Sequence, residues 1–188
     1  MAVLRIRITG DPVLHTVASP VTEFDSELRA LVDDMFETME AAPGVGLAGP
    51  QVGVGKRLFV FNWTDDDDVL WRGVAINPEL LIAPLPVGEA DEDDDSEGCL
   101  SIPGERYPLI RSDRAILRAV DLDEKPFEID ATGWLARIFQ HEYDHLDGVL
   151  YADRLEHPHN KAVAKAIRKN SWGNPGASWM PGVDDLEG

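Results

Sequence analysis

Residues 140–148 read QHEYDHLDG, and the HEYDH within this stretch predicts a helix that carries a metal site. Residues four apart in an α-helix lie on the same face, so His141 and His145 would point in one direction. Two histidines at this spacing are typical zinc-type ligands, and Glu142 stands where such sites have their general base. Apolar side chains recur at helical spacing over residues 132–146. We therefore expect one buried central helix with the two histidines on it.

The segments around this helix predict an α+β fold. Residues 26–41 carry an apolar stripe at helical spacing, and Pro158 can open a further helix that ends near Asn170. Apolar runs predict strands at residues 57–63, 74–77, 115–121 and 127–129, with a turn at 123–126. We expect mostly antiparallel sheets packed around the central helix, with an N-terminal and a C-terminal helix.

Length and composition favour one domain. The chain has 188 residues, 44% of them hydrophobic, which suits a single globular core. We expect a single catalytic domain at residues 1–170 and a flexible, acidic, Gly/Pro-rich tail at residues 171–188. No apolar run resembles a signal peptide or a membrane span, and a single cysteine fits a reducing compartment. A cytoplasmic protein is expected.

The charge of the chain limits its partners. The formal net charge is −18, with acidic runs at residues 65–68 and 89–95. Such runs are usually solvated loops, and a chain this acidic repels nucleic acids and anionic membranes. We therefore expect no membrane partner and no specific nucleic-acid sequence as a partner.

The glycine-rich segment at residues 44–49, GVGLAG, matches the G-x-G-x-x-G fingerprint of dinucleotide-binding loops. That fingerprint works where a strand precedes it and a helix follows, because the helix N-terminus holds the pyrophosphate. Here the predicted order is helix, glycines, strand. The segment therefore favours a tight turn or a substrate-binding loop over a nucleotide site.

A catalytic metal site of this kind needs a third protein ligand and one open position. The position of the third histidine in the long metzincin motif is occupied by Tyr151, which does not serve. Other downstream candidates are poorly placed in the sequence: Glu156, His157, His159 and Glu187. Cys99 is the strongest candidate, because a thiolate with two imidazoles makes a tetrahedral site. A buried, inert thiol is the alternative interpretation of Cys99.

Three stretches together resemble the signature motifs of the peptide deformylase family: GVGLAGPQ at 44–51, EGCLS at 97–101 and QHEYDHLDG at 140–148. The resemblance extends from the first helix to about Leu155. Most members of the family have alanine where Gly49 stands, a difference that affects loop packing more than chemistry. The resemblance implies removal of the formyl group from the N-terminal formyl-methionine of nascent polypeptides, with release of formate.

The resemblance also implies a metal centre and a proton-transfer residue. Cys99, His141 and His145 would hold one divalent metal ion. In the family this is typically Fe²⁺, and Zn²⁺, Ni²⁺ or Co²⁺ can substitute. Glu142 would take a proton from the attacking water and later pass it to the leaving amine.

Further residues are expected around the substrate. The Gln51 amide and the Leu100 backbone N–H would stabilise negative charge on the formyl oxygen. Backbone groups for a substrate bound as an added strand would come from Val45, Gly46 and Gly98. Trp134 and Ile138 would form the apolar pocket for the methionine side chain, or simply the buried face of their helix. Arg106 would contact substrate carbonyls, or else be an exposed loop arginine.

Alternatives remain for the function and for one surface feature. A metallopeptidase could use the same helix, and a non-catalytic metal-binding or nucleotide-binding protein is the further alternative. A basic stripe at helical spacing contains Lys161, Lys165, Arg168 and Lys169. Such a stripe is usually a solvated face. Because related enzymes act on chains leaving the ribosome, it is also a candidate ribosome contact through phosphates.

Overall fold

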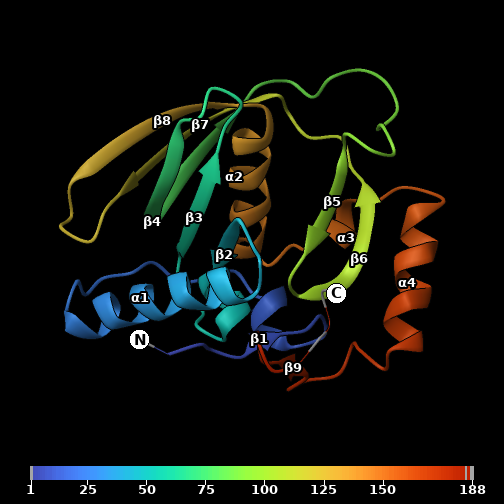
Figure 1. Cartoon of the computed structure of the whole chain (residues 1–188), viewed down its shortest axis with the longest axis horizontal. Helices are drawn as coiled ribbons and strands as arrows, with labels where there is room; N and C mark the ends of the chain where they lie inside the picture. The colour runs from blue at the N-terminus through green and yellow to red at the C-terminus, as the bar shows by residue number, and fades with distance from the viewer. Residues whose placement is uncertain (1, 185, 187–188) are drawn as a thin grey trace.

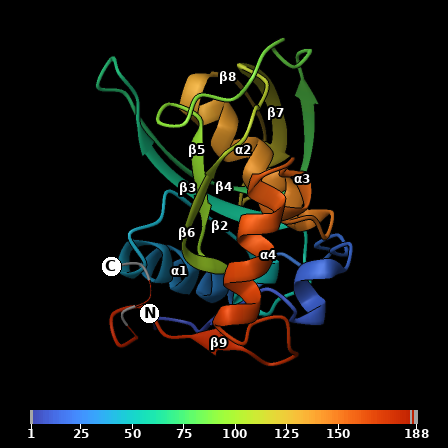
Figure 2. The same cartoon turned by 90° about the vertical axis from the view of Figure 1, so that its right-hand side faces the viewer.

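The structure is a computed structural model that describes residues 2–184 and 186 (Figures 1 and 2). Its helices are α1 (Ser26–Ala41), α2 (Gly133–Leu146), α3 (Tyr151–Arg154) and α4 (His159–Lys169), with 3₁₀ turns η1 (Pro12–His15) and η2 (Gly49–Val52). Its strands are β1 (Ile6–Arg7), β2 (Gly46–Ala48), β3 (Leu58–Thr64), β4 (Leu70–Ile82), β5 (Ser96–Cys99), β6 (Ile102–Pro108), β7 (Arg114–Val120), β8 (Pro126–Thr132) and β9 (Ser178–Trp179). No helix among these residues is long and apolar enough to cross a membrane.

The expected α+β fold with antiparallel sheets is confirmed. The main sheet has the strand order β2-β3-β4-β7-β8, and each neighbouring pair is antiparallel. Two smaller antiparallel pairs are β5-β6 and β1-β9. Helix α2 lies between the main sheet and the β5-β6 hairpin, as Figure 1 shows. The helix therefore contacts both halves of the molecule.

Helix α2 is central because apolar side chains bury one side of it against the main sheet. Phe139 is fully buried, and its ring centroid lies 6.1 Å from that of Phe59 and 5.1 Å from that of Phe61 on β3. Leu135 and Ile138 belong to the same cluster. The polar residues of the HEYDH motif are also buried, so they must find partners inside the protein.

Helix α1 forms over the residues that the apolar stripe predicts. The Asp25 side chain caps it by accepting hydrogen bonds from the backbone N–H groups of Glu27 and Leu28. Met35 and Met39 are fully buried in a cluster that also includes residues of β2, β3 and β4. This packing fixes the glycine-rich segment that follows the helix.

The structure extends one predicted strand and adds others. The expected strand at residues 74–77 is the middle of the much longer β4. Its pairing with β7 shifts register between Ile76 and Glu79, and Asn77 there has a φ of 50°. The Asn77 side chain exchanges two hydrogen bonds with the backbone of Val21. Because Asn77 and Pro78 interrupt the apolar pattern, the sequence did not predict that the strand continues.

The C-terminal segment differs from the expected flexible tail. Residues 178–179 form β9, which pairs with β1 near the other end of the chain. Trp179 is 2% exposed, and its indole N–H donates a hydrogen bond of 2.8 Å to the carbonyl of Leu100. A single large aromatic side chain anchors a segment whose Gly/Pro content predicts disorder. Residues 185 and 187–188 of the expected tail lie outside the described residues, and the boundary at residue 170 stays a prediction.

We predict that Trp179→Ala lowers the free energy of unfolding by about 3 to 5 kcal/mol, because it empties a filled site in the core. Urea denaturation followed by circular dichroism measures the change. Val183→Ala is the matched control, since Val183 is 79% exposed in the same segment and should change stability by less than about 0.5 kcal/mol. Equal stability of Trp179→Ala and the wild type would contradict the role given to β9.

Candidate functional site

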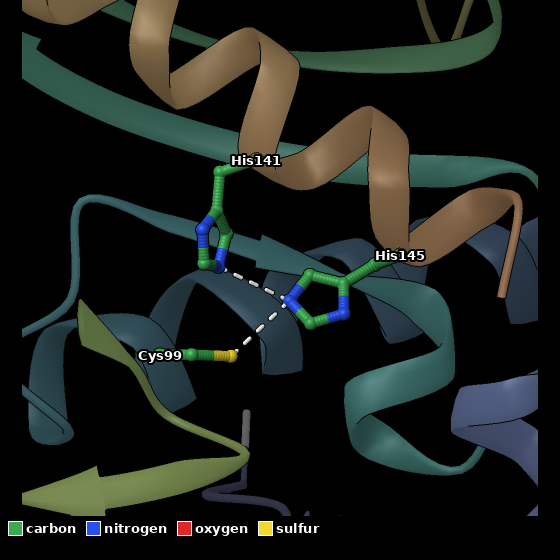
Figure 3. Close-up of side chains that lie close together, drawn as sticks. All are labelled: Cys99, His141 and His145. Carbon is green, nitrogen blue, oxygen red and sulfur yellow. Dashed lines mark hydrogen bonds between the residues drawn. The ribbon is translucent and has the colours of Figure 1, made fainter. Parts of the chain in front are cut away.

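The structure brings Cys99, His141 and His145 together in a buried cluster (Figure 3). Cys99 comes from the end of β5, and both histidines come from α2. The distance from Cys99 Sγ to His145 Nε2 is 3.4 Å, and His145 Nε2 lies 3.2 Å from His141 Nε2. Within the described part of the chain, no other group of three His, Cys, Asp or Glu side chains converges in this way.

The geometry of this cluster fits a metal ion. Ligand atoms that lie about 2.0 to 2.3 Å from one tetrahedral metal are roughly 3.3 to 3.7 Å apart. The two measured separations, 3.4 Å and 3.2 Å, are close to this range. One soft sulfur and two imidazole nitrogens suit Zn²⁺ or Fe²⁺ better than a hard cation such as Mg²⁺. The three residues could therefore hold a metal and leave a fourth position open.

Glu97 orients His141 through the ring nitrogen that points away from the cluster, Nδ1. Its carboxylate accepts a hydrogen bond of 2.7 Å from His141 Nδ1, which leaves Nε2 as the free ligand atom. Arg111 holds the same carboxylate with two hydrogen bonds, of 3.0 Å and 2.7 Å. Arg111 also donates to Asp144, which in turn accepts from Arg154. Glu97, Arg111, Asp144 and Arg154 thus form a connected network of charged groups behind His141.

Burial alone would raise the pKa of Glu97, but the hydrogen bond to His141 and the charge of Arg111 hold it well below its ordinary value. The group is therefore a carboxylate. Sequence analysis missed both Glu97 and Arg111. Glu97 stands inside the EGCLS stretch and could have been suspected there. Arg111 has no local signal, because its partners Glu97 and Asp144 are far away in the sequence.

Glu142 is buried beside the cluster with one unsatisfied oxygen. The side chain is 4% exposed, and its Oε2 atom makes no hydrogen bond. Burial raises the pKa of Glu142 to about 7. A Cβ at Gly46 would lie 2.3 Å from Glu142 Oε1, so only glycine leaves room for this carboxylate. The arrangement suits a group that gains and loses a proton near neutral pH.

Gln51 is 1% exposed, so its amide is buried next to the cluster and is not a surface group. Its Oε1 atom accepts a hydrogen bond of 2.8 Å from the backbone N–H of Ala48. Its Nε2 atom has only longer contacts, 3.5 Å to Ser101 Oγ and 3.8 Å to Cys99 Sγ. The backbone thus holds the oxygen, and the amide N–H groups remain directed towards the cluster.

A pocket of about 300 Å³ opens beside these residues. The residues that sequence analysis assigned to the site line it, apart from His145: Val45, Gly46, Gln51, Gly98, Cys99, Leu100, Arg106, Trp134, Ile138, His141 and Glu142. His145 lies deeper, at 1% exposure. Lining residues that sequence analysis did not single out include Pro43, Trp63, Glu97 and Arg137.

The structure bears on three sequence interpretations at this pocket. Trp134 was expected either in the apolar pocket or on the buried face of its helix, and its side chain is 40% exposed and lines the pocket. The glycines of residues 44–49 lead into the short β2 and a four-residue 3₁₀ turn, not into a helix that could hold a pyrophosphate. Arg106 is exposed and lines the pocket, and it stands on β6 and not in a loop.

Comparison with known proteins gives a consistent result. A family model described as polypeptide deformylase matches residues 3–161. The peptide deformylase of Tropheryma whipplei (strain TW08/27) is 50% identical over 95% of this chain and 94% of its own. That of Mycolicibacterium smegmatis is 49% identical over 97% of this chain and 96% of its own.

Solved structures agree with these relatives. The crystal structure of a peptide deformylase from Legionella pneumophila has a TM-score of 0.76 and 38% identity, and covers 90% of this chain and 96% of that one. A peptide deformylase from Synechococcus elongatus, solved in complex with actinonin, has a TM-score of 0.74 and 37% identity, and covers 90% of this chain and 88% of that one.

We predict that Cys99→Ala loses tight metal binding while the domain still folds. The loss should exceed the roughly 10- to 100-fold weakening that follows removal of an outer partner of a ligand. Atomic emission gives the metal content, and circular dichroism checks the fold. Ser101→Ala, a change on the same hairpin at a residue that is not a ligand, should keep its metal. A stoichiometric metal in Cys99→Ala would show that the thiol is not a ligand.

Proposed function

The chain belongs to the peptide deformylase family, an enzyme family, and we propose that it removes the formyl group from the N-terminal formyl-methionine of nascent polypeptides and releases formate. One observation carries this proposal. A single pocket contains the possible ligands Cys99 and His141, the Glu142 carboxylate with its unpaired Oε2, and the Gln51 amide, whose Nε2 has only long contacts. Hydrolysis of a formamide needs these components within reach of one carbonyl group.

The expected metal is Fe²⁺, with Zn²⁺, Ni²⁺ or Co²⁺ able to substitute, and Cys99, His141 and His145 would hold it. When bound there, the metal would supply Lewis-acid polarisation and a lowered pKa for water. Glu97 keeps His141 in the tautomer that a ligand needs, through the 2.7 Å bond to Nδ1. The protein thereby fixes the ligand before any metal arrives.

Glu142 performs the proton transfers in this proposal. Its carboxylate accepts a proton from the water that attacks the formyl carbon. When the C–N bond breaks, it donates that proton to the leaving amine, so that formate and a free N-terminus result. The buried position, with Oε2 unpaired and a pKa of about 7, supports both steps.

Two donors stabilise the negative charge that develops on the formyl oxygen. The Gln51 Nε2 group is one, because it has only long contacts of 3.5 Å and 3.8 Å within the protein. The backbone N–H of Leu100 is the other, and the hydrogen bond from Trp179 to the carbonyl on the other side of the Leu100 Cα restrains the backbone of this residue. Donors held in place before reaction need no reorganisation as charge develops.

The rest of the pocket receives the peptide. Ile138 and Trp134 offer an apolar surface for the methionine side chain. Val45, Gly46 and Gly98 offer backbone groups along which the substrate would lie as an added strand. Arg106 packs across Gly98, since a Cβ there would lie 3.1 Å from Arg106 Cγ. It is thus within reach of substrate carbonyl groups.

Formate release from a formyl-methionyl peptide tests the function directly. Mass spectrometry of the same reaction shows whether internal peptide bonds stay intact. Formate release without internal cleavage supports a deformylase, whereas cleavage supports a metallopeptidase. The absence of both supports a non-catalytic metal-binding protein.

We predict that Glu142→Gln keeps its metal and lowers kcat by about 10³-fold or more, because one carboxylate serves both proton transfers. Formate release gives kcat, and atomic emission gives the metal content of the same sample. Tyr143→Phe, at the next position of α2, is the control and should keep near-normal turnover. Loss of the metal in Glu142→Gln would make the glutamate a ligand, and retained turnover would remove it from the mechanism.

We further propose that the enzyme acts in the cytoplasm and docks on the ribosome through α4. The four basic residues named above are exposed on this helix, whereas Val163 and Ala166 on its other side are buried. The helix thus presents a positive face on a chain of net charge −18. Contacts of such a face with RNA phosphates weaken as salt rises.

We predict that replacing all four basic residues of α4 with glutamate reduces co-sedimentation with ribosomes by about 10-fold or more at low salt. The wild type should also dissociate as salt is raised. The control makes the same change of charge at exposed basic residues away from α4: Arg29, Arg114, Arg118 and Lys125. Equal binding by both variants would reject docking through α4.

A further inference from the structure

Arg137 is a buried arginine in the pocket wall to which sequence analysis gave no role. It stands on α2, one turn before His141, and is 8% exposed. Its guanidinium donates a 2.7 Å hydrogen bond to the carbonyl of Leu109 and approaches Glu97 Oε2 at 3.3 Å. It also forms an ion pair with Asp95, the last residue of the acidic segment 89–95. Two separate segments, residues 95–97 and Leu109, therefore fix its position.

The same guanidinium lies against the pocket tryptophan. Arg137 Cζ is 5.2 Å from the centroid of the Trp134 ring, a cation–π contact. Trp134 also has an aromatic neighbour, Trp63, at a centroid distance of 6.2 Å and an interplanar angle of 33°. Because Trp134 is 40% exposed, the surrounding core does not hold it by itself. Its orientation depends on Arg137 and Trp63.

Arg137 contributes little to holding the Glu97 carboxylate, because its contact with Glu97 is the longer one, at 3.3 Å. Arg111 already holds the Glu97 carboxylate with two shorter hydrogen bonds. Loss of Arg137 therefore leaves the orientation of His141 largely intact. Among the described residues, in contrast, no second cation lies over the Trp134 ring to take the place of Arg137.

We propose that Arg137 is a positioning residue for the side chain of the substrate: anchored by Asp95 and the Leu109 carbonyl, it holds the Trp134 ring as a wall of the pocket. The inference rests on the proposed deformylase function and deepens it. A fixed wall favours a long, unbranched first side chain, such as that of methionine, over a short one. Arg137 thereby links the acidic segment to substrate selection.

The test compares two peptides that differ only in the first residue, formyl-methionyl and formyl-alanyl. The quantity measured is the ratio of their kcat/KM values for formate release. This ratio is independent of the fraction of active enzyme, so a variant that is only less stable leaves it unchanged. Absence of formate release from the wild type would overturn the proposed function itself, whereas the ratio in active variants tests Arg137.

In Arg137→Met we expect the ratio to fall about 10-fold, through a higher KM for the formyl-methionyl peptide with kcat largely retained. Trp134→Ala should lower the ratio to a similar extent. The double variant should have the same ratio as Trp134→Ala alone, because Arg137 acts through the Trp134 ring. Arg114→Met, which removes an exposed arginine paired with Asp130, should leave the ratio unchanged.

Asp95→Asn provides a milder test at a partly exposed position, should Arg137→Met not fold. It removes the ionic anchor of Arg137 and should lower the ratio in the same direction by a smaller factor. Asp93→Asn, the same change at an exposed residue of the segment, is its control. A ratio equal to that of the wild type in Arg137→Met overturns the inference. If only Asp95→Asn folds, a wild-type ratio in that variant overturns it. Independent effects of Arg137 and Trp134 in the double variant overturn it as well.

Discussion

The contact on which the site depends most is the one between the buried carboxylate of Glu97 and its closest partners, Arg111 and His141. Glu97 belongs to β5 and His141 to α2, so this contact joins the small hairpin to the central helix. A buried carboxylate is strongly destabilising unless its partners are complete, and losing one partner typically costs about 3 to 5 kcal/mol. The hairpin therefore has few alternative positions on the helix. Because Cys99 ends the same strand, the contact of Glu97 with His141 and Arg111 also sets the distance between the Cys99 sulfur and the two imidazoles.

The site combines this fully paired group with an unpaired one. Glu97 has each of its oxygens engaged and is held as a carboxylate. Glu142, on the next position of α2 after His141, has an oxygen without a partner and a pKa raised by burial to about 7. The two carboxylates differ in environment, and that difference is enough to separate their roles. The paired one holds a ligand in place, and the unpaired one is free to exchange a proton.

The sequence predicted those features that local patterns encode. Helices α1, α2 and α4 follow from apolar periodicity and capping residues. The possible metal ligands, Glu142 and Gln51 follow from three motifs that resemble a known family. The pairing of Arg111 with Glu97 and Asp144 was not predictable, because contacts between distant segments leave no periodic signal. Nor was the cation–π contact of Arg137 with Trp134, although both stand on the same helix. The β9 strand was missed because one buried tryptophan, Trp179, outweighs the glycines and prolines around it.

The pairing of β1 with β9 joins Ile6, near the start of the chain, to Trp179, near its end. Closing such a long loop is slow compared with forming local helices and hairpins. The backbone at Leu100 therefore gains its hydrogen bond from Trp179 only late in folding. The pocket wall at Leu100 would thus be complete only after β1 and β9 have paired.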